Sequence, residues 1–354
     1  MAKQLPLNNL WSSLNTRFEI EDGWEIPSRF KNIPLDYKAA QHAGLIDFSH
    51  RGKIEVRGAD RISFLHNILT NDIENLKPGQ ACSTALLSAP GKMLAFMRAF
   101  NLEDRVLLDM DPGLEEKLPA LLDKYLITED AEIKKASLIH LALCGSEAEN
   151  ILRLLQVPEI TQPLQTVTAN IQGKPVLVFK RRDSFYEILL EEQDSRLVLE
   201  ILKAGEKSGL VPVGLRAAEI LRIEAGELRY GLDMTEEIAL PETGLEDLAA
   251  SETKGCYPGQ EVVARTKTYK GLQKKMTRLI FNGDVVPAAG TKIFNAEDGK
   301  EIGWVTSACY SPEIRKGLGL GYLRKGYFEK EQAVFVESDS LKLEGKTDVR
   351  AEVI

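Results

Sequence analysis

The chain has 354 residues, 44% of them hydrophobic, so it is long enough to bury a large core and to form two or three domains. Its formal net charge is −8, with 45 basic and 53 acidic residues, which argues against attraction of the whole molecule to nucleic acid or anionic lipid. No stretch approaches the length of a membrane span, and the first residues lack the apolar core of a secretory signal. We therefore expect a cytoplasmic protein.

The four cysteines are Cys82, Cys144, Cys256 and Cys309. They are widely spaced, and no histidine stands at metal-ligand spacing to any of them, so we expect no permanently bound metal. Scattered thiols also suit a reducing compartment better than a disulfide framework does. Cys82, Cys144 and Cys309 lie in apolar or strand-like runs, which predicts small core residues.

The first part of the chain predicts a mixed α and β structure. We treat residues 1–35 as an N-terminal extension, to which no pattern assigns a role. Residues 53–57 predict a strand, and Asp60 is placed to cap a helix that follows it. Strands are expected around residues 83–87, 93–100 and 105–111, and a helix near residues 115–126.

Two further segments have their own patterns. Residues 136–204 predict the order strand, helix, two strands and helix, which suggests a small ferredoxin-like unit. Residues 274–354 contain short alternating segments separated by Gly, Asn, Asp and Pro, which predicts a small β-barrel domain. The barrel strands are expected over residues 276–281, 291–294, 301–310, 316–323, 333–337 and 348–354.

The stretch GLRAAEILRIEAGEL, from Gly214, predicts a helix that ends at Gly226. Its apolar stripe, expected to face the core, consists of Leu215, Ala218, Leu221 and Ala225. Glu224 is unusual there, because an acid in the last helical turn faces the negative end of the helix dipole. From the residues alone a salt bridge to Arg222 or Arg229 is the favoured explanation. The alternative is a carboxylate that accepts hydrogen bonds from a ligand with an N–H-rich edge.

Charge is segregated after this helix. Seven acidic residues and no Lys or Arg lie between Tyr230 and Thr253, whereas seven basic residues and one acid lie between Lys254 and Arg278. Taken singly, Lys267, Lys270, Lys274 and Lys275 are expected on a solvated face. As a group they can hold a ligand that bears carboxylates.

The octapeptide KGCYPGQE, residues 254–261, combines a thiol with a turn. Pro258 and Gly259 suit the central positions of a type II turn, and Gln260 and the residues after it can begin a helix. Cys256 would then lie close to Lys254 and to a helix N-terminus, two influences that favour a reactive thiolate. The alternative is a buried structural cysteine beside Tyr257.

The segment KGCYPGQEVVART resembles the signature of the YgfZ-type folate-binding proteins, iron–sulfur cluster assembly and repair factors related to the T-protein (aminomethyltransferase) of the glycine cleavage system. Three other segments resemble the T-protein pattern: HRGKIEVRGADRISFLHNILTNDIENLKPGQ, LRIEAGELRYGLDM and DGKEIGWVTSACYSPEIRKGLGLGYL. Together they extend from about residue 36 to the end of the barrel segment.

The resemblance implies an α+β fold with three domains in a cloverleaf around a central tetrahydrofolate site. These domains would be a folate-binding domain of residues 36–135 and 205–273, the ferredoxin-like unit of residues 136–204, and the barrel of residues 274–354. By this analogy Glu224 reads the pterin ring, which reverses the preference for a salt bridge. The other folate contacts that the resemblance suggests are Arg51, Arg222, Tyr230, Lys254, Gln260, Glu261 and Arg265.

One departure from the T-protein pattern concerns the segment GKMLAFMRAF. The T-protein carries a pair of acidic residues there, one of them catalytic, and the aligned residues here are Ala95 and Phe96. Neither side chain can hold charge or move a proton, so aminomethyl transfer of the usual kind is in doubt.

The leading hypothesis is therefore a monomeric folate-binding protein that helps to assemble or repair iron–sulfur clusters in client enzymes, with Cys256 as the functional thiol. Its expected partners are a folate and iron–sulfur client or assembly proteins. A folate-dependent one-carbon transferase with a different acid or base is the first alternative. A binding or scaffold protein in which Cys256 only packs is the second.

Overall fold

A computed structural model describes residues 2–268, 271–338 and 341–348 of the chain. The chain divides into two compact units. Unit 1 comprises Met1–His66, Ile73–Ser83 and Met97–Ala218, and unit 2 comprises Asn67–Asp72, Thr84–Phe96 and Glu219–Ile354. The division falls within four elements, which are α3 (Arg61–Ile68), β6 (Gln80–Leu87), β7 (Met93–Asn101) and α7 (Leu215–Glu224).

The predicted N-terminal extension is folded and belongs to unit 1. A three-stranded sheet in the order β1-β3-β2 is formed by β1 (Lys3–Gln4), β2 (Arg17–Glu21) and β3 (Trp24–Arg29). Helix α1 (Asn8–Ser12) lies in this segment, and α2 (Ile33–His42) begins at its end. Trp11 of α1 is 1% exposed and contributes to the main core of unit 1, so the segment is part of that core.

A six-stranded sheet in the order β11-β12-β13-β10-β4-β14 forms the centre of unit 1. Its strands are β4 (Gly44–Asp47), β10 (Leu138–Cys144), β11 (Thr166–Ile171), β12 (Lys174–Arg182), β13 (Phe185–Glu191) and β14 (Val211–Val213). The segment predicted as a ferredoxin-like unit supplies four of them, including β11, which the sequence did not predict. Strands β4 and β14 complete the sheet from outside that segment, and β14 pairs with β4 in parallel.

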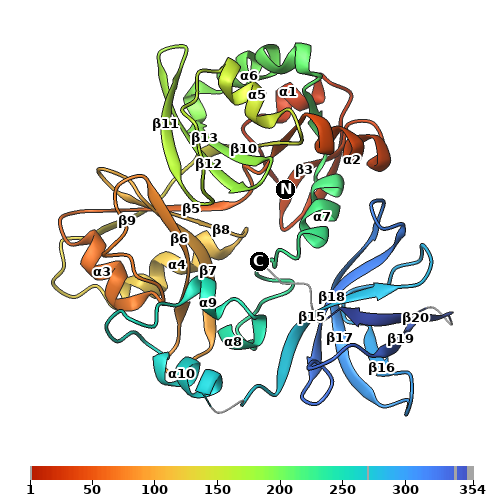
Figure 1. Cartoon of the computed structure of the whole chain (residues 1–354). Coiled ribbons are helices and arrows are strands. Elements are labelled where there is room, and N and C mark those ends of the chain that lie inside the picture. The colour runs from red at the N-terminus through yellow and green to blue at the C-terminus, as the bar shows by residue number, and fades with distance from the viewer. Residues whose placement is uncertain (1, 269–270, 339–340, 349–354) are drawn as a thin grey trace. The chain divides into compact units, whose positions relative to one another are not determined.

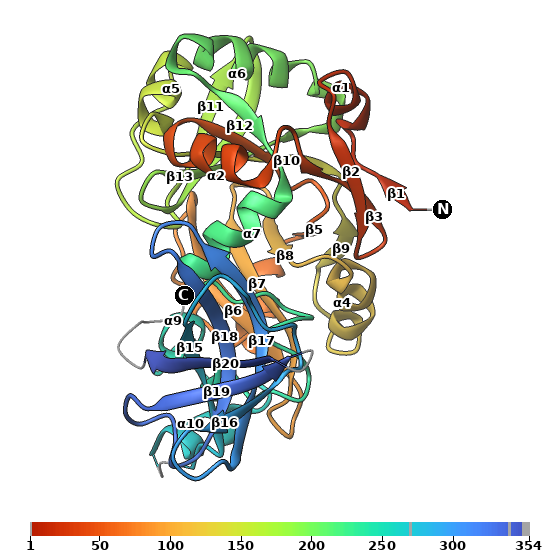
Figure 2. The same ribbon diagram turned by 90° about the vertical axis from the view of Figure 1, so that its right-hand side faces the viewer.

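Helices cover one face of this sheet. α5 (Ala148–Leu154) and α6 (Leu197–Gly205) lie side by side on it in both views (Figure 1 and Figure 2), and short 3-10 turns at Glu192–Asp194 and Glu206–Ser208 flank α6. The core beneath them includes Ile151, Val198 and Ile201 from the helices and Leu141, Val178 and Ile188 from the strands. The other face of the sheet carries His140, Glu187 and Phe179, because side chains alternate between faces along each strand.

A five-stranded sheet in the order β6-β7-β8-β5-β9 includes β5 (Gly52–Arg57), β8 (Val106–Met110) and β9 (Glu132–Lys135). The helices beside it are α3 and α4 (Leu114–Asp123). The strands and helices predicted for residues 53–126 are all present. Within unit 1 an apolar cluster joins the two larger sheets, and it consists of Phe100, Leu107, Leu138, Phe179 and Leu189.

Unit 2 contains a closed barrel in the order β15-β18-β17-β16-β19-β20. The strands are β15 (Lys274–Phe281), β16 (Lys292–Asn295), β17 (Glu301–Ser311), β18 (Lys316–Arg324), β19 (Ala333–Ser338) and β20 (Leu341–Asp348). The barrel begins at Lys274 as predicted. The last predicted strand is shifted: β20 precedes it, and residues 349–354 lie outside the described residues.

Alternation along the barrel strands produces two apolar surfaces. Leu279, Phe281 and Val305 point into the barrel, whereas Met276, Leu320 and Tyr322 lie on its outside and pack against Ile223 of α7. Gly321 allows the close approach of two strands, since a Cβ there would lie 2.5 Å from the carbonyl oxygen of Trp304. The outer surface thus fixes the end of α7 against the barrel within unit 2.

Unit 2 also contains the short helices α8 (Leu240–Thr243), α9 (Glu246–Ala249) and α10 (Gln260–Thr268). They surround an apolar cluster that includes Met93, Met234, Leu240 and Tyr257. The protein is thus of the α+β class with a C-terminal six-stranded barrel, as predicted. Among residues 2–268, 271–338 and 341–348, no helix has the length and apolar character that crossing a membrane requires.

Candidate functional site

The end of α7 is fixed by a Schellman motif. Gly226 has φ +72°, its N–H donates to the carbonyl of Ile223 at 3.1 Å, and the N–H of Glu227 donates to the carbonyl of Arg222 at 3.0 Å. The helix therefore ends where Gly226 predicted. Glu224 is its last residue.

The apolar face of α7 differs from the predicted stripe. Ala218 is buried as expected, but Leu215, Leu221 and Ala225 are only half-buried. Ala217 and Ile223 are the more buried positions, at 1% exposure each. Because α7 crosses the boundary between the units, its two halves contact different surroundings, and a single stripe does not describe both.

The carboxylate of Glu224 lies beside β17 of the barrel. Its Oε1 accepts a hydrogen bond from Ser311 Oγ at 2.5 Å. Cys309 on the same strand is 8% exposed, and its burial, together with the charges of Glu224 and Glu219, raises the pKa of the thiol to about 12. Glu224 is thus a half-buried carboxylate next to a polar and thiol-bearing stretch of the barrel wall.

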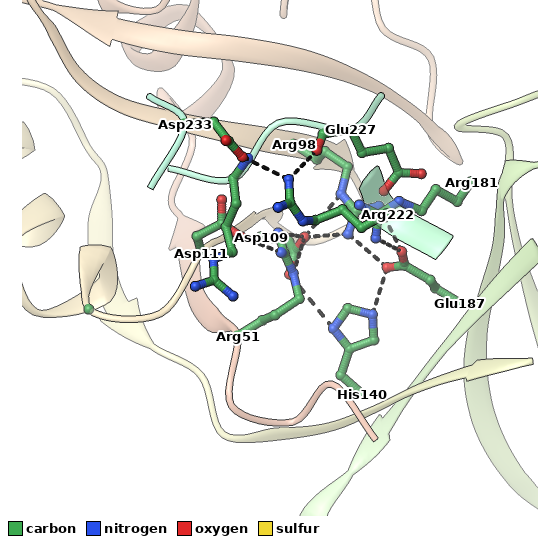
Figure 3. Close-up of polar contacts among 12 residues, drawn as sticks. Arg51, Arg98, Asp109, Asp111, His140, Arg181, Glu187, Arg222, Glu227 and Asp233 are labelled. Carbon is green, nitrogen blue, oxygen red and sulfur yellow. Dashed lines mark hydrogen bonds and ion pairs between the residues drawn. The ribbon is translucent and has the colours of Figure 1, made fainter. Parts of the chain in front are cut away.

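The guanidinium of Arg222 forms several hydrogen bonds within unit 2. It donates to both carboxylate oxygens of Glu219, to Oδ2 of Asp233 at 2.7 Å and to the carbonyl of Glu227 at 2.5 Å. A further bond reaches Ser307 Oγ on β17 at 2.8 Å. These bonds join α7, the following loop and the barrel, and those to Asp233 and Glu227 are visible in Figure 3. The contact of Arg222 with folate stays a prediction.

Asp233 is the centre of this arrangement, and the sequence did not single it out. It is 1% exposed, and its carboxylate also accepts bonds from Thr306 Oγ1 and Ser307 Oγ, both at 2.6 Å. The hydroxyl of Tyr322 donates to its backbone carbonyl at 3.0 Å. In the sequence, Asp233 stood out only as one of the seven acidic residues between Tyr230 and Thr253.

The side chain of Tyr230 is hydrogen-bonded to the first residues of β7. Its hydroxyl donates to the carbonyls of Met93 at 2.8 Å and Leu94 at 3.0 Å, and its ring packs on the cluster that includes Phe96. Burial, followed by the charge of Glu236, raises the pKa of this phenol. Tyr230 therefore supports the strand segment that contains Ala95.

The positions at which the T-protein pattern has acids are apolar here. Ala95 is fully buried, and Phe96 is half-buried and packs against the same apolar cluster as Tyr230 and Leu228. Neither Ala95 nor Phe96 carries a group that can donate or accept a proton.

The loop of residues 254–259 forms the predicted type II turn. Gly259 has φ +80°, and the N–H of Gln260 donates to the carbonyl of Tyr257 at 3.2 Å. A Cβ at Gly259 would lie 2.7 Å from the carbonyl oxygen of Ser88, so glycine is required for this approach. α10 starts directly after the turn, as predicted.

Cys256 is exposed and lies between two buried residues of the loop, Lys254 and Tyr257. Lys254 is 8% exposed and Tyr257 is 7% exposed, whereas the thiol-bearing residue itself lies at the surface. The alternative of a buried structural cysteine is therefore wrong. Cys144 and Cys309 are buried as predicted, but Cys82 is only half-buried and was wrongly placed in the core.

The other residues of the motif have different surroundings. Gln260 accepts the N–H of Tyr257 at 3.4 Å and so supports its own turn. Glu261 and Arg265 are exposed on α10. Lys274 lies 5.4 Å from the ring centroid of Trp304. The side chain of Lys267 is not described, and Lys270 lies outside the described residues.

Arg51 belongs to unit 1, where it enters a buried ionic network. Its guanidinium donates to Asp109 and, at 2.6 Å, to Asp111. Burial alone would lower the pKa of Arg51, but the charges of Asp109 and Asp111 outweigh it and raise the pKa. The side chain predicted to contact folate thus has two carboxylate partners in unit 1.

The same network links the two larger sheets of unit 1. Arg98 of β7 donates to Asp109 of β8 at 2.5 Å and to Glu187 of β13 at 2.7 Å. His140 of β10 lies 2.6 Å from Glu187 and 3.7 Å from Asp109 (Figure 3). Burial and the charge of Lys53 lower the pKa of His140 to about 4, so the imidazole is neutral at pH 7.

Within the described residues, no group of three or more His, Cys, Asp or Glu side chains is arranged to hold a metal ion.

Comparison with known proteins places this chain in a family. The family model described as the GCVT N-terminal domain matches residues 7–252, and the model described as the glycine cleavage T-protein C-terminal barrel domain matches residues 274–349. The chain belongs to the glycine cleavage T-protein family.

Individual relatives agree with this assignment. The chain is 30% identical to an aminomethyltransferase of Halalkalibacterium halodurans over 352 residues, which cover 94% of this chain and 93% of the relative. It is 30% identical over 348 residues to the aminomethyltransferase of Bacillus subtilis, with 95% of each chain covered. The crystal structure of glycine cleavage system aminomethyltransferase T from Bartonella henselae has a TM-score of 0.89 at 25% identity, with coverage of 98% and 96%.

These findings confirm the resemblance to the T-protein. They do not include the narrower resemblance to YgfZ-type proteins, which rests on the segment KGCYPGQEVVART.

Proposed function

We propose that this chain binds a reduced folate, and that Glu224 is the residue that reads the pterin ring. The supporting observation is a half-buried carboxylate at the end of α7, oriented by Ser311 and by a fixed helix terminus. A carboxylate offers about four acceptor positions, and the N–H groups of a pterin are donors that such positions accept. The names of the relatives, aminomethyltransferases, fit a folate substrate.

The remaining predicted contacts have unequal support. Arg222 and Tyr230 act through the residues that they hold in place, since their polar atoms bond to protein groups. Arg265 is exposed on α10, and we propose it as a contact for the carboxylates of the folate tail. We assign the folate to the domain of residues 36–135 and 205–273.

The first candidate activity on this folate is transfer of a one-carbon group, as the names of the relatives suggest. Because Ala95 and Phe96 replace the acids of the T-protein pattern, the proton must move through another group. General acid–base catalysis contributes about 10²- to 10⁴-fold to a rate. We therefore expect release of ammonia and methylenetetrahydrofolate from an aminomethylated carrier protein to be at least about a hundredfold slower than with the Bacillus subtilis relative.

The test compares the wild type with Phe96→Asp, which places a carboxylate at a half-buried position. A rate increase in the variant supports a transferase that lacks its acid. A wild-type rate equal to that of the relative would show that the acid lies elsewhere. If neither protein releases product while both bind folate, the transferase candidate is wrong and folate binding stands.

A second candidate is favoured by the exposure of Cys256. A surface thiol in an anchored loop suits an accessory factor that assembles or repairs iron–sulfur clusters in client enzymes. The experiment is a deletion strain scored for several iron–sulfur enzyme activities and rescued by wild type or by Cys256→Ser. Full rescue by the variant would contradict this role. Under either candidate we propose a monomeric cytoplasmic protein, and sedimentation of the purified chain tests the monomer.

A further inference from the structure

The ammonium of Lys254 points to the buried side of its loop. It donates to the carbonyl oxygens of Leu69 and, at 3.4 Å, Asn71, and it lies 5.1 Å from the ring centroid of Tyr257. All four residues belong to unit 2. The charge of Lys254 is thus placed against backbone oxygens and an aromatic face, both of which attract a cation.

The turn that receives this ammonium is itself firmly held. Thr70 Oγ1 accepts the N–H of Ala85 at 2.8 Å and donates to the carbonyl of Ala249 at 2.5 Å. The N–H of Ser251 donates to the carbonyl of Thr70 at 3.0 Å. Lys254 therefore attaches its loop to a turn that is itself hydrogen-bonded to Ala85 of β6, to Ala249 at the end of α9 and to Ser251 just after it.

The loop is held on the far side of the thiol as well. The ring of Tyr257 packs in the cluster that includes Ala85 and Met93, and Gly259 approaches the carbonyl of Ser88. In the hairpin turn between β6 and β7, a Cβ on Gly91 would lie 2.7 Å from Val262 of α10. Gly255 and Cys256 are the two exposed residues between these two anchors.

We infer that Lys254 is a positioning residue, whose ammonium ties the loop to the Leu69–Asn71 turn and so fixes the exposed Cys256 at the surface. This differs from the expectation that Lys254 acts on the thiol by its charge. The inference rests on the second candidate function for the use of the thiol, but its test measures the loop and the thiol directly.

The experiment uses the full-length chain with Lys254→Met, which keeps the apolar stem and removes the ammonium. Amide hydrogen exchange of residues 67–72 and 251–259 is compared with that of the barrel. Labelling of Cys256 by iodoacetamide is followed from pH 6 to 10, with peptide masses separating it from Cys82. The matched control is Lys274→Met, which removes another ammonium over an aromatic ring in unit 2.

We expect exchange in both segments to rise at least tenfold in Lys254→Met and to stay at the wild-type rate in the control. The pH midpoint of Cys256 labelling in Lys254→Met should stay within half a pH unit of the wild-type midpoint. Unchanged exchange would overturn the inference, and so would a midpoint raised by a full pH unit, because ionisation of the thiol would then depend on the charge.

If Lys254→Met does not fold, the same exchange measurement on Lys254→Arg tests the inference. It keeps the charge but brings a broader planar head into the space between the carbonyls. Faster exchange with the charge retained supports positioning, and wild-type exchange overturns it. Neither result depends on rescue of iron–sulfur enzymes, so a failure of the second candidate function remains separate.

Discussion

Arg222 and Asp233 form a buried ion pair in unit 2, with 2.7 Å between Nη1 and Oδ2. The aspartate side chain is fully buried and that of the arginine is 11% exposed. Because the pair connects α7 to the loop before the barrel, it determines where Glu224 is presented. Arg222, which the sequence suggested as a folate contact, thus also holds the helix that carries Glu224, the contact that we propose.

Asp233→Asn should destabilise unit 2 strongly. The substitution leaves the guanidinium of Arg222 with one carboxylate partner, and breaking a buried ion pair costs about 3 to 5 kcal/mol. Denaturant unfolding followed by circular dichroism measures the loss. The matched control is Asp284→Asn, an exposed aspartate of the same unit, which should change the free energy of unfolding by less than about 0.5 kcal/mol. Equal effects of the two substitutions would contradict a structural role for the pair.

Glu224→Gln should weaken binding of a reduced folate while the fold is retained. The amide keeps the shape of the side chain but loses the charge and part of its acceptor capacity. Loss of a charge-assisted hydrogen bond corresponds to roughly 1.5 to 3 kcal/mol, or about ten- to a hundredfold in affinity. Calorimetric titration with tetrahydrofolate measures it, and Glu313→Gln at the exposed turn after β17 is the control. Unchanged affinity in Glu224→Gln would remove this residue from the site.

The pH dependence of stability should reflect His140. Its pKa is lowered from 6.5 to about 4 in the folded chain, so the unfolded state binds more protons between these values. Stability from this group is complete above pH 6.5 and is lost as the pH falls to about 4, by about 3 kcal/mol at most. Asp109 and Glu187, whose pKa values are lowered well below their ordinary values, act in the same direction at lower pH.

His140→Gln tests this assignment. Thermal unfolding measured from pH 7 to pH 4 should fall less steeply in the variant than in the wild type. The exposed His42 offers a control, since His42→Gln should leave the slope unchanged. A variant with the slope of the wild type would show that other groups dominate this range.

The sequence predicted the local elements better than the buried polar contacts. Hydrophobic alternation located the barrel, and the pair Pro258 and Gly259 predicted the turn, because both depend on neighbours in the chain. The ionic network of unit 1 depends on pairing between β7, β8, β10 and β13, which lie far apart in the sequence. A signal was nevertheless present. Arg98, Asp109 and His140 are each the single Arg, Lys, Asp, Glu or His of an otherwise apolar strand, and Glu187 lies within the mostly apolar run of residues 185–190. Such strands are buried on both faces.

Under the second candidate function, the thiol at Cys256 should be needed for activity and not for folding. The side chain is exposed, so Cys256→Ala removes few contacts and should shift the thermal midpoint by no more than a few degrees, or roughly 1 kcal/mol. Folate affinity should also persist, because Glu224 lies on a different element. Rescue of iron–sulfur enzyme activities in a deletion strain should fall sharply, since alanine has no nucleophile. Cys82→Ala, at the half-buried thiol, is the control and should rescue fully. Full rescue by Cys256→Ala would assign the exposed thiol no role in that function.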